Sequence, residues 1–195
     1  MSMLDMLQQR LGGEAVQQIS QRLGTDPATT QSAIAAALPM LVGGLAKNAQ
    51  DPAGAGSLSN ALRKDHDGSI LDNLAGYLGG SQPGADGAGI LGHIFGGHTG
   101  AVEQGVSQVS GMEPGKTSAL LSMLAPLVMG ALGRSARERG LDPGGLASML
   151  GGEREHAAQR APGGLMGMLS GLLDKNHDGS VVDDIGGMIG SRFGR

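Results

Sequence analysis

LPMLVG at residues 38–43 and APLVMG at residues 125–130 decide the fold, because each stretch places a proline in the middle of an apolar run. The surrounding runs, 33–46 and 119–133, are rich in Leu, Ala, Met and Gly, which is typical of helices buried in a core. A proline inside a helix removes one backbone hydrogen bond and bends the helix axis. We therefore expect two long buried helices, each with a bend or a break at its proline.

The two proline-bearing runs belong to a longer internal repeat. Residues 15–46 align with 101–133 across one short gap, and LRKDHDGSILDNL at 62–74 aligns with LDKNHDGSVVDDI at 173–185. The second copy carries an insertion of roughly two dozen residues around 134–164. Two copies are too few for a solenoid, so the sequence predicts an all-α fold of two tandem homologous units with proline-kinked central helices.

The predicted units are residues 1–80 and 90–195, joined by a flexible glycine-rich linker at 81–89. In the first unit, a helix–glycine–helix pattern over 17–36 has Gly24 at its turn. This pattern resembles helix-turn-helix or homeodomain-like packing. Its packed positions are expected to be Ile19, Leu23 and Ile34.

Composition argues against nucleic acid as a partner. The formal net charge is −4, and the sequence contains no cluster of Lys and Arg of the kind that holds a phosphate backbone. Residues 28–38, the second helix of the pattern, contain neither Lys nor Arg, although a DNA-reading helix needs side chains for phosphates and base edges. The absence of cysteine also removes disulfides and thiolate metal sites.

Membrane insertion and export are not expected. Neither 33–46 nor 119–133 reaches the roughly 18 to 20 apolar residues that cross a bilayer, so both are interpreted as core helices. Association with a membrane surface is kept as an alternative. Residues 1–9 show no basic region followed by an apolar core, so a cytoplasmic location is expected.

Catalytic motifs are missing from the sequence. It contains no Gly-x-Ser-x-Gly elbow, no P-loop and no dinucleotide fingerprint, and its five histidines form no zinc-binding pair at helical spacing with a glutamate. The histidines are expected at the surface, and the protein is predicted not to be an enzyme. No cofactor is expected other than calcium.

The aspartate loops are the candidate metal sites. The loop at 174–185 places oxygen-bearing side chains at alternate positions, with glycine at the sixth, as an EF-hand calcium loop does. Its twelfth position is Ile185, where a bidentate Glu is expected. The alternative is an Asp-Gly turn in which Ser-x-x-Asp caps the next helix. The candidate calcium ligands are Asp174, Asn176, Asp178, Ser180 and Asp184, with Asp65 and Asp67 as a weaker set in the first loop.

Mixed charges fill the stretch 134–160, where Arg and Glu alternate without a run of one sign. We expect this stretch to be a solvated helix end followed by a loop. A docking surface is the alternative interpretation.

Three motifs together resemble a known bacterial family. They are GILGHIFGG at 89–97, LAPLVMGALG at 124–133 and the closing Asp-x-Asn-x-Asp-Gly-Ser loop that begins at Asp174. The combination is similar to a family of bacterial domains of unknown function related to the YidB-like proteins. The resemblance implies a small helical protein and supplies no functional residues.

The function predicted from the sequence is a non-enzymatic interaction or scaffold protein that self-associates, with another copy of the chain as the expected partner. Helices rich in Leu, Met, Ala and Gly suit such close association. The alternative is a calcium-responsive binding module that uses the loop at 174–185.

Calcium titration separates these two functions. If the loop binds calcium, millimolar calcium will release or absorb heat on mixing and raise the melting temperature, because a ligand that prefers the folded state stabilises it. Isothermal titration and thermal unfolding measure both effects. Absence of heat together with an unchanged melting temperature would remove the calcium function.

Overall fold

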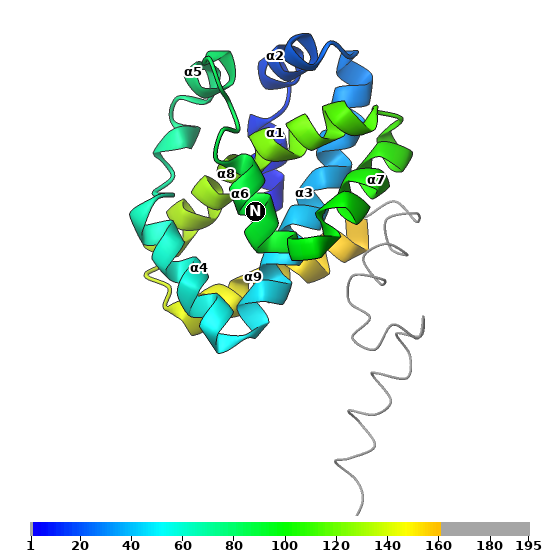
Figure 1. Ribbon diagram of the computed structural model, residues 1–195. Helices are drawn as coiled ribbons and strands as arrows, with labels where there is room; N and C mark the ends of the chain where they lie inside the picture. The colour runs from blue at the N-terminus through cyan, green and yellow to red at the C-terminus, as the bar shows by residue number, and fades with distance from the viewer. Residues whose placement is uncertain (1, 161–195) are drawn as a thin grey trace, which may run out of the picture.

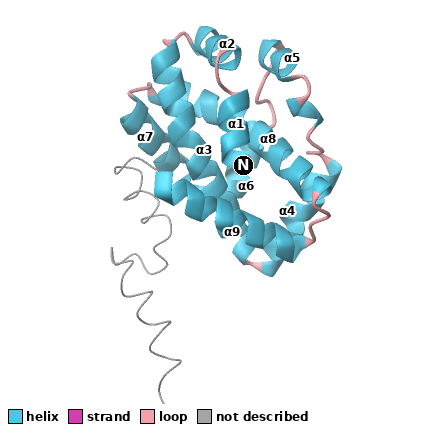
Figure 2. Ribbon diagram, turned by 180° about the vertical axis from the view of Figure 1, so that it is seen from behind, coloured by secondary structure: helices cyan, strands magenta, loops and turns pink. Residues whose placement is uncertain are grey.

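The computed structural model describes residues 2–160, and within that range the chain is helical, with no strand (Figures 1 and 2). This confirms the predicted all-α class. The α-helices are α1 (Met3–Arg10), α2 (Glu14–Leu23), α3 (Pro27–Gln50), α4 (Pro52–Lys64), α5 (Leu74–Gly79), α6 (Gly87–Phe95), α7 (Thr99–Ser110), α8 (Pro114–Glu138) and α9 (Pro143–Arg160). Two short 3-10 helices, η1 (Ser69–Leu71) and η2 (Gly96–His98), lie between them.

Caps and prolines set where the long helices begin. Before α3, the Asp26 carboxylate accepts a hydrogen bond from the Thr29 N–H at 2.9 Å, and Pro27 stands in the first turn. The first turn has N–H groups without helical partners, so a side-chain acceptor and a proline both suit it. Gly24, in the left-handed conformation at φ 59°, ends α2 and permits the sharp turn into α3.

The predicted packing of this helix–turn–helix is observed. Ile19 and Ile34 are buried, and Leu23 is half-buried against the same core.

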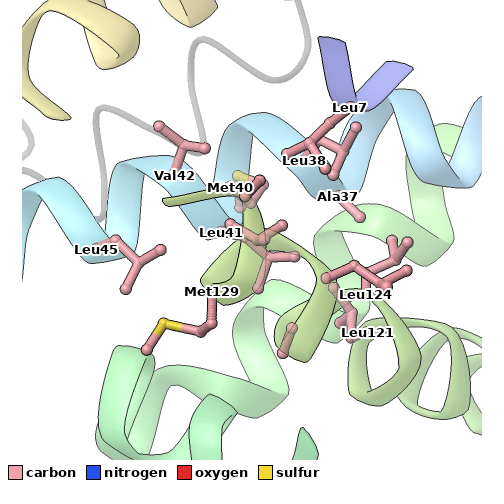
Figure 3. Packing of buried hydrophobic residues seen from close by; sticks show 14 of the residues in the cluster. Leu7, Ala37, Leu38, Met40, Leu41, Val42, Leu45, Leu121, Leu124 and Met129 are labelled. Carbon is pink, nitrogen blue, oxygen red and sulfur yellow. The ribbon is translucent and has the colours of Figure 1, made fainter. Parts of the chain in front are cut away.

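Helices α3 and α8 form the centre of the core (Figure 3). Both run through their internal prolines as single helices, so, of the expected bend or break, a break does not occur. Each proline removes a single backbone hydrogen bond, and burial of the flanking apolar residues holds the two halves of the helix together. The side chains packed here include Leu38, Leu41, Leu45, Leu121, Leu124 and Met129, all of them buried.

Both central helices are longer than the apolar runs from which they were predicted. They have 24 and 25 residues, and an 18-residue window in each reaches a mean hydropathy of 1.3 or 1.4. By length and composition alone they could therefore cross a membrane, which corrects the expectation that they are too short. The reason is that the helices extend past the apolar runs into flanking polar residues. In the folded chain, 72% of each window is buried.

Helices from the two predicted units share one core. Helix α3 packs against α7 and α9, which come from the second predicted unit, as well as against its neighbour α4. Helix α6 packs chiefly on α8. The order α1–α2–α3 has the same form as α6–α7–α8, since each series ends in a long helix with an internal proline after a left-handed glycine.

The charged stretch 134–160 begins as expected with the exposed end of α8 and a short turn, but from Pro143 it is helical and partly buried, which corrects the expectation of a loop there. Helix α9 packs along α3 and α4 and brings Glu153 into contact with the first turn of α1. The Glu153 carboxylate accepts hydrogen bonds from the N–H groups of Met3 at 2.7 Å and Leu4 at 3.3 Å. A carboxylate at a helix N-terminus satisfies its free N–H groups and suits the helix dipole.

Glu153→Ala is expected to destabilise the fold by roughly 1–3 kcal/mol, because it leaves two buried N–H groups without acceptors. Thermal unfolding measures the loss. The matched control is Glu155→Ala, two residues along α9 and exposed, which should have little effect. Equal melting temperatures for the two variants would contradict the capping role of Glu153.

Candidate functional site

A groove of about 460 Å³ lies between α3, α4 and α6, with Met129 of α8 also in its lining. Most of its exposed lining is apolar, and polar groups stand among the apolar ones. A concave apolar surface with a few polar groups is the usual form of a binding site. The lining residues are Leu45, Asn48, Gly54, Ser57, Leu58, Ala61, Asp65, His66, Ile90, His93, Ile94 and Met129.

Two features fix α6 against α3 at this groove. The Asn48 side-chain amide donates to the carbonyls of His93 at 2.8 Å and Ile94 at 3.3 Å, which belong to the last turn of α6. Gly44 has no Cβ, and a Cβ at that position would lie 2.5 Å from the Ile94 side chain and 2.6 Å from that of Phe95. Glycine therefore permits the close contact that forms one wall of the groove.

The first aspartate loop is a capped turn attached to α8. The Asp67 carboxylate accepts a hydrogen bond from the Ser69 N–H at 2.9 Å, and hydrogen bonds from Ser69 lower the pKa of Asp67. Arg134 of α8 donates to the Asp72 carboxylate at 2.5 Å and to the Gly68 carbonyl at 3.1 Å. The charges of this loop thus serve a turn and an ion pair.

The predicted metal ligands are placed as follows. Asp65 and Asp67 are exposed, and they join no group of three or more His, Asp or Glu side chains able to hold a metal within residues 2–160. The second loop lies outside the described residues, so metal binding there is still a prediction. The candidate ligands in question are Asp174, Asn176, Asp178, Ser180 and Asp184.

His66 lines both the groove and a neighbouring cavity of about 170 Å³. It is half-buried, whereas a surface position was expected, and His93 on the other side of the groove is exposed as expected. Burial lowers the pKa of His66, although the carboxylates of Asp65 and Asp86 act in the opposite direction. The imidazole is therefore largely neutral at pH 7.

The smaller cavity lies at the proline of α8. Pro126 has no N–H, so the helix does not supply the usual backbone donor to the Ser122 carbonyl. The Tyr77 hydroxyl donates to the carbonyl of the following residue, Met123, at 3.1 Å. Burial raises the pKa of Tyr77 to about 12. A tyrosine distant in sequence thus adds a hydrogen-bond donor at the turn of α8 that contains the proline.

Two glycines of the expected flexible linker, 81–89, lie against the same turn of α8, whereas most of the other linker residues are exposed. A Cβ on Gly84 would lie 2.8 Å from the Ser122 carbonyl, and a Cβ on Gly87 would overlap it outright. Helix α6 already begins at Gly87. These glycines therefore allow close backbone contact with α8.

Sequence reasoning missed the groove itself. Its walls come from three helices that are separated along the chain, and no single helix shows a pattern that marks it. The only signals were Gly44 and the family-like stretch that contains Ile90 and Ile94, and neither indicates which helices meet.

The chain belongs to the family described as bacterial protein of unknown function (DUF937), whose model matches residues 5–135 and 145–195. No match was found among curated proteins or among solved structures. The membership confirms the bacterial family resemblance at this coarser level.

The single tyrosine gives a direct test of the contact at the bend, since the chain has no tryptophan to obscure its absorbance. Near-ultraviolet titration should show Tyr77 ionising near pH 12 in the folded protein and near pH 10 when it is unfolded. Because the folded pKa is the higher one, Tyr77 stabilises the fold below about pH 10 and loses that contribution as the pH rises to about 12.

Tyr77→Phe should also lower stability at neutral pH, by about 0.5–1.5 kcal/mol for one hydrogen bond. The variant should lose less stability than the wild type between pH 10 and 12. Ionisation of Tyr77 at its ordinary pKa in the folded chain would contradict the buried contact.

Proposed function

We propose that the protein is a non-enzymatic helical interaction protein, a scaffold that self-associates through the groove between α3, α4 and α6. The observation that carries the proposal is the apolar lining of that groove, to which Leu45, Leu58, Ile90 and Ile94 contribute. An apolar groove between helices accepts the apolar side chains of a further helix.

A second copy of the chain is the proposed occupant. Among the described residues, Val109 is the large hydrophobic side chain that is exposed, at 39%, so a flat apolar face does not compete with the groove. The chain supplies helices rich in Leu, Met, Ala and Gly, whose slender and adaptable side chains fit a narrow groove. Its net charge of −4 gives no reason to expect a polyanion instead.

The ionisable groups near the groove support a binding role over a catalytic one. The pKa of His66 is lowered by burial, and no described hydrogen bond joins it to a carboxylate that would orient it as a base. Asp67 and Asp72 are used by the turn and by Arg134. These contacts hold the first aspartate loop, whose residues Asp65 and His66 line the groove.

Several finer predictions belong to the same proposal. They are an origin by internal duplication, a relationship of the family to the YidB-like proteins, and a cytoplasmic location. The repeated order of helices before and after residue 80 supports the duplication. Calcium binding by residues 174–185 is the alternative function, tested by the titration described above.

Ser57→Arg tests the groove. Ser57 is exposed on α4 and lines the groove, so a long charged side chain there should block an incoming helix without disturbing the core. We expect the dissociation constant for self-association to rise at least about tenfold, which is equivalent to about 1.4 kcal/mol. Sedimentation equilibrium over a range of concentrations measures the change.

Asn60→Arg is the matched control, since Asn60 is exposed on the same helix and lies outside the groove lining. It should associate like the wild type. A wild-type protein that stays monomeric at every concentration, or equal effects of the two variants, would contradict self-association through the groove.

A further inference from the structure

The contact between the first aspartate loop and α8 is built from three matched features. Gly130 lies under Ile70, where a Cβ would come within 2.6 Å of the isoleucine side chain. Gly133 lies against the His66 carbonyl, closely enough that a Cβ would overlap it. Arg134 then pairs with a loop carboxylate, that of Asp72. Small residues allow the loop to approach, and the arginine holds it.

Helix α3 repeats the sequence pattern with which α8 contacts the loop. The two proline-bearing helices can be aligned on Pro39 and Pro126. The contact residues of α8 named above then correspond, in order, to Gly43, Ala46 and Lys47 of α3. The pattern is again small, small and basic at the same spacing. Gly43 and Ala46 are buried, and Lys47 is exposed.

The second aspartate loop repeats the residues with which the first loop contacts α8. HDGSVVD at 177–183 corresponds to HDGSILD at 66–72, so that Val181 stands for Ile70 and Asp183 stands for Asp72. The apolar residue, the glycine and the carboxylate are all kept. Both partners of the contact are therefore present a second time in the chain.

We propose that residues 177–183 dock on α3 of the same chain, with Val181 over Gly43 and Asp183 paired with Lys47. Charge complementarity supports this choice of occupant, because a carboxylate again faces a basic side chain. Chain length allows it as well. Helix α9 packs along α3 and ends at Arg160, and the 16 residues that follow, 161–176, can span up to about 50 Å.

One substitution makes the second contact looser than the first. Ala46 carries a methyl group where Gly133 has none, and at Gly133 the loop carbonyl occupies the space of that methyl group. The second loop must therefore sit farther from the helix axis at this point. The contacts at Gly43 and Lys47 do not depend on that position.

Cross-linking of engineered cysteines tests the docking, and the cysteine-free chain makes the experiment clean. Lys47→Cys with Asp183→Cys, treated with a short thiol-reactive cross-linker in EDTA, should give an intramolecular product. Asp72→Cys with Arg134→Cys is the positive control, because those side chains are in contact. Lys116→Cys with Asp183→Cys is the negative control. Lys116 bonds to the Gly24 carbonyl, about 30 Å along α3 from Lys47.

A monomer cross-linked between positions 47 and 183, without a product from the negative control, is the expected result. Two outcomes would overturn the proposal. Cross-linked dimers alone would place the loop on a second copy, and no product where the positive control reacts would mean that the loop does not dock there.

Charge reversal supplies an independent readout. Lys47→Asp should increase hydrogen exchange of residues 174–185 roughly two- to fivefold, the range expected for a partly exposed ion pair. Adding Asp183→Lys should restore the slower exchange. Failure of the double variant to recover, with both proteins folded by circular dichroism, would overturn the pairing of Asp183 with Lys47.

Discussion

Close approach of neighbouring backbones to α3 and α8 is the constraint on which the structure depends. The chain has one Tyr, two Phe and no Trp, so few side chains are large enough to bridge wide gaps between helices. Glycines bring the elements together instead. Gly44 admits α6, Gly130 and Gly133 admit the first aspartate loop, and Gly87 admits the start of α6 to the bend of α8. Dense contact replaces large side chains as the source of dispersion energy.

The proline of α8 shows how one local defect organises distant parts of the chain. Pro126 removes a hydrogen bond in one of the two central buried helices, and buried carbonyls without donors are costly. The Tyr77 hydroxyl and the glycines of 81–89 gather at that turn, and a small cavity containing His66 forms beside it. The small cavity beside Pro126 thus lies next to the apolar groove, and His66 lines both.

Several carboxylates in the described part of the chain have structural roles. Its conspicuous carboxylates already have structural partners, since Glu153 caps α1, Asp72 pairs with Arg134, and Asp67 closes a turn. The surface feature without such a task is the apolar groove. The proposed binding of an apolar helix makes use of this feature.

The sequence by itself determined the helical class, the two buried central helices and the turn at Gly24, because these depend on periodicity and on neighbouring residues. The Asp-Gly turn of the first loop was also predictable from local chemistry. Only the tertiary structure decided that α6, α7 and α9 pack on helices far away in the chain, that Glu153 is buried, and that Gly84 and Gly87 lie against α8. It likewise decided that a groove joins His66 and His93. Each of these results depends on which distant segments meet, and local patterns contain no information about that choice.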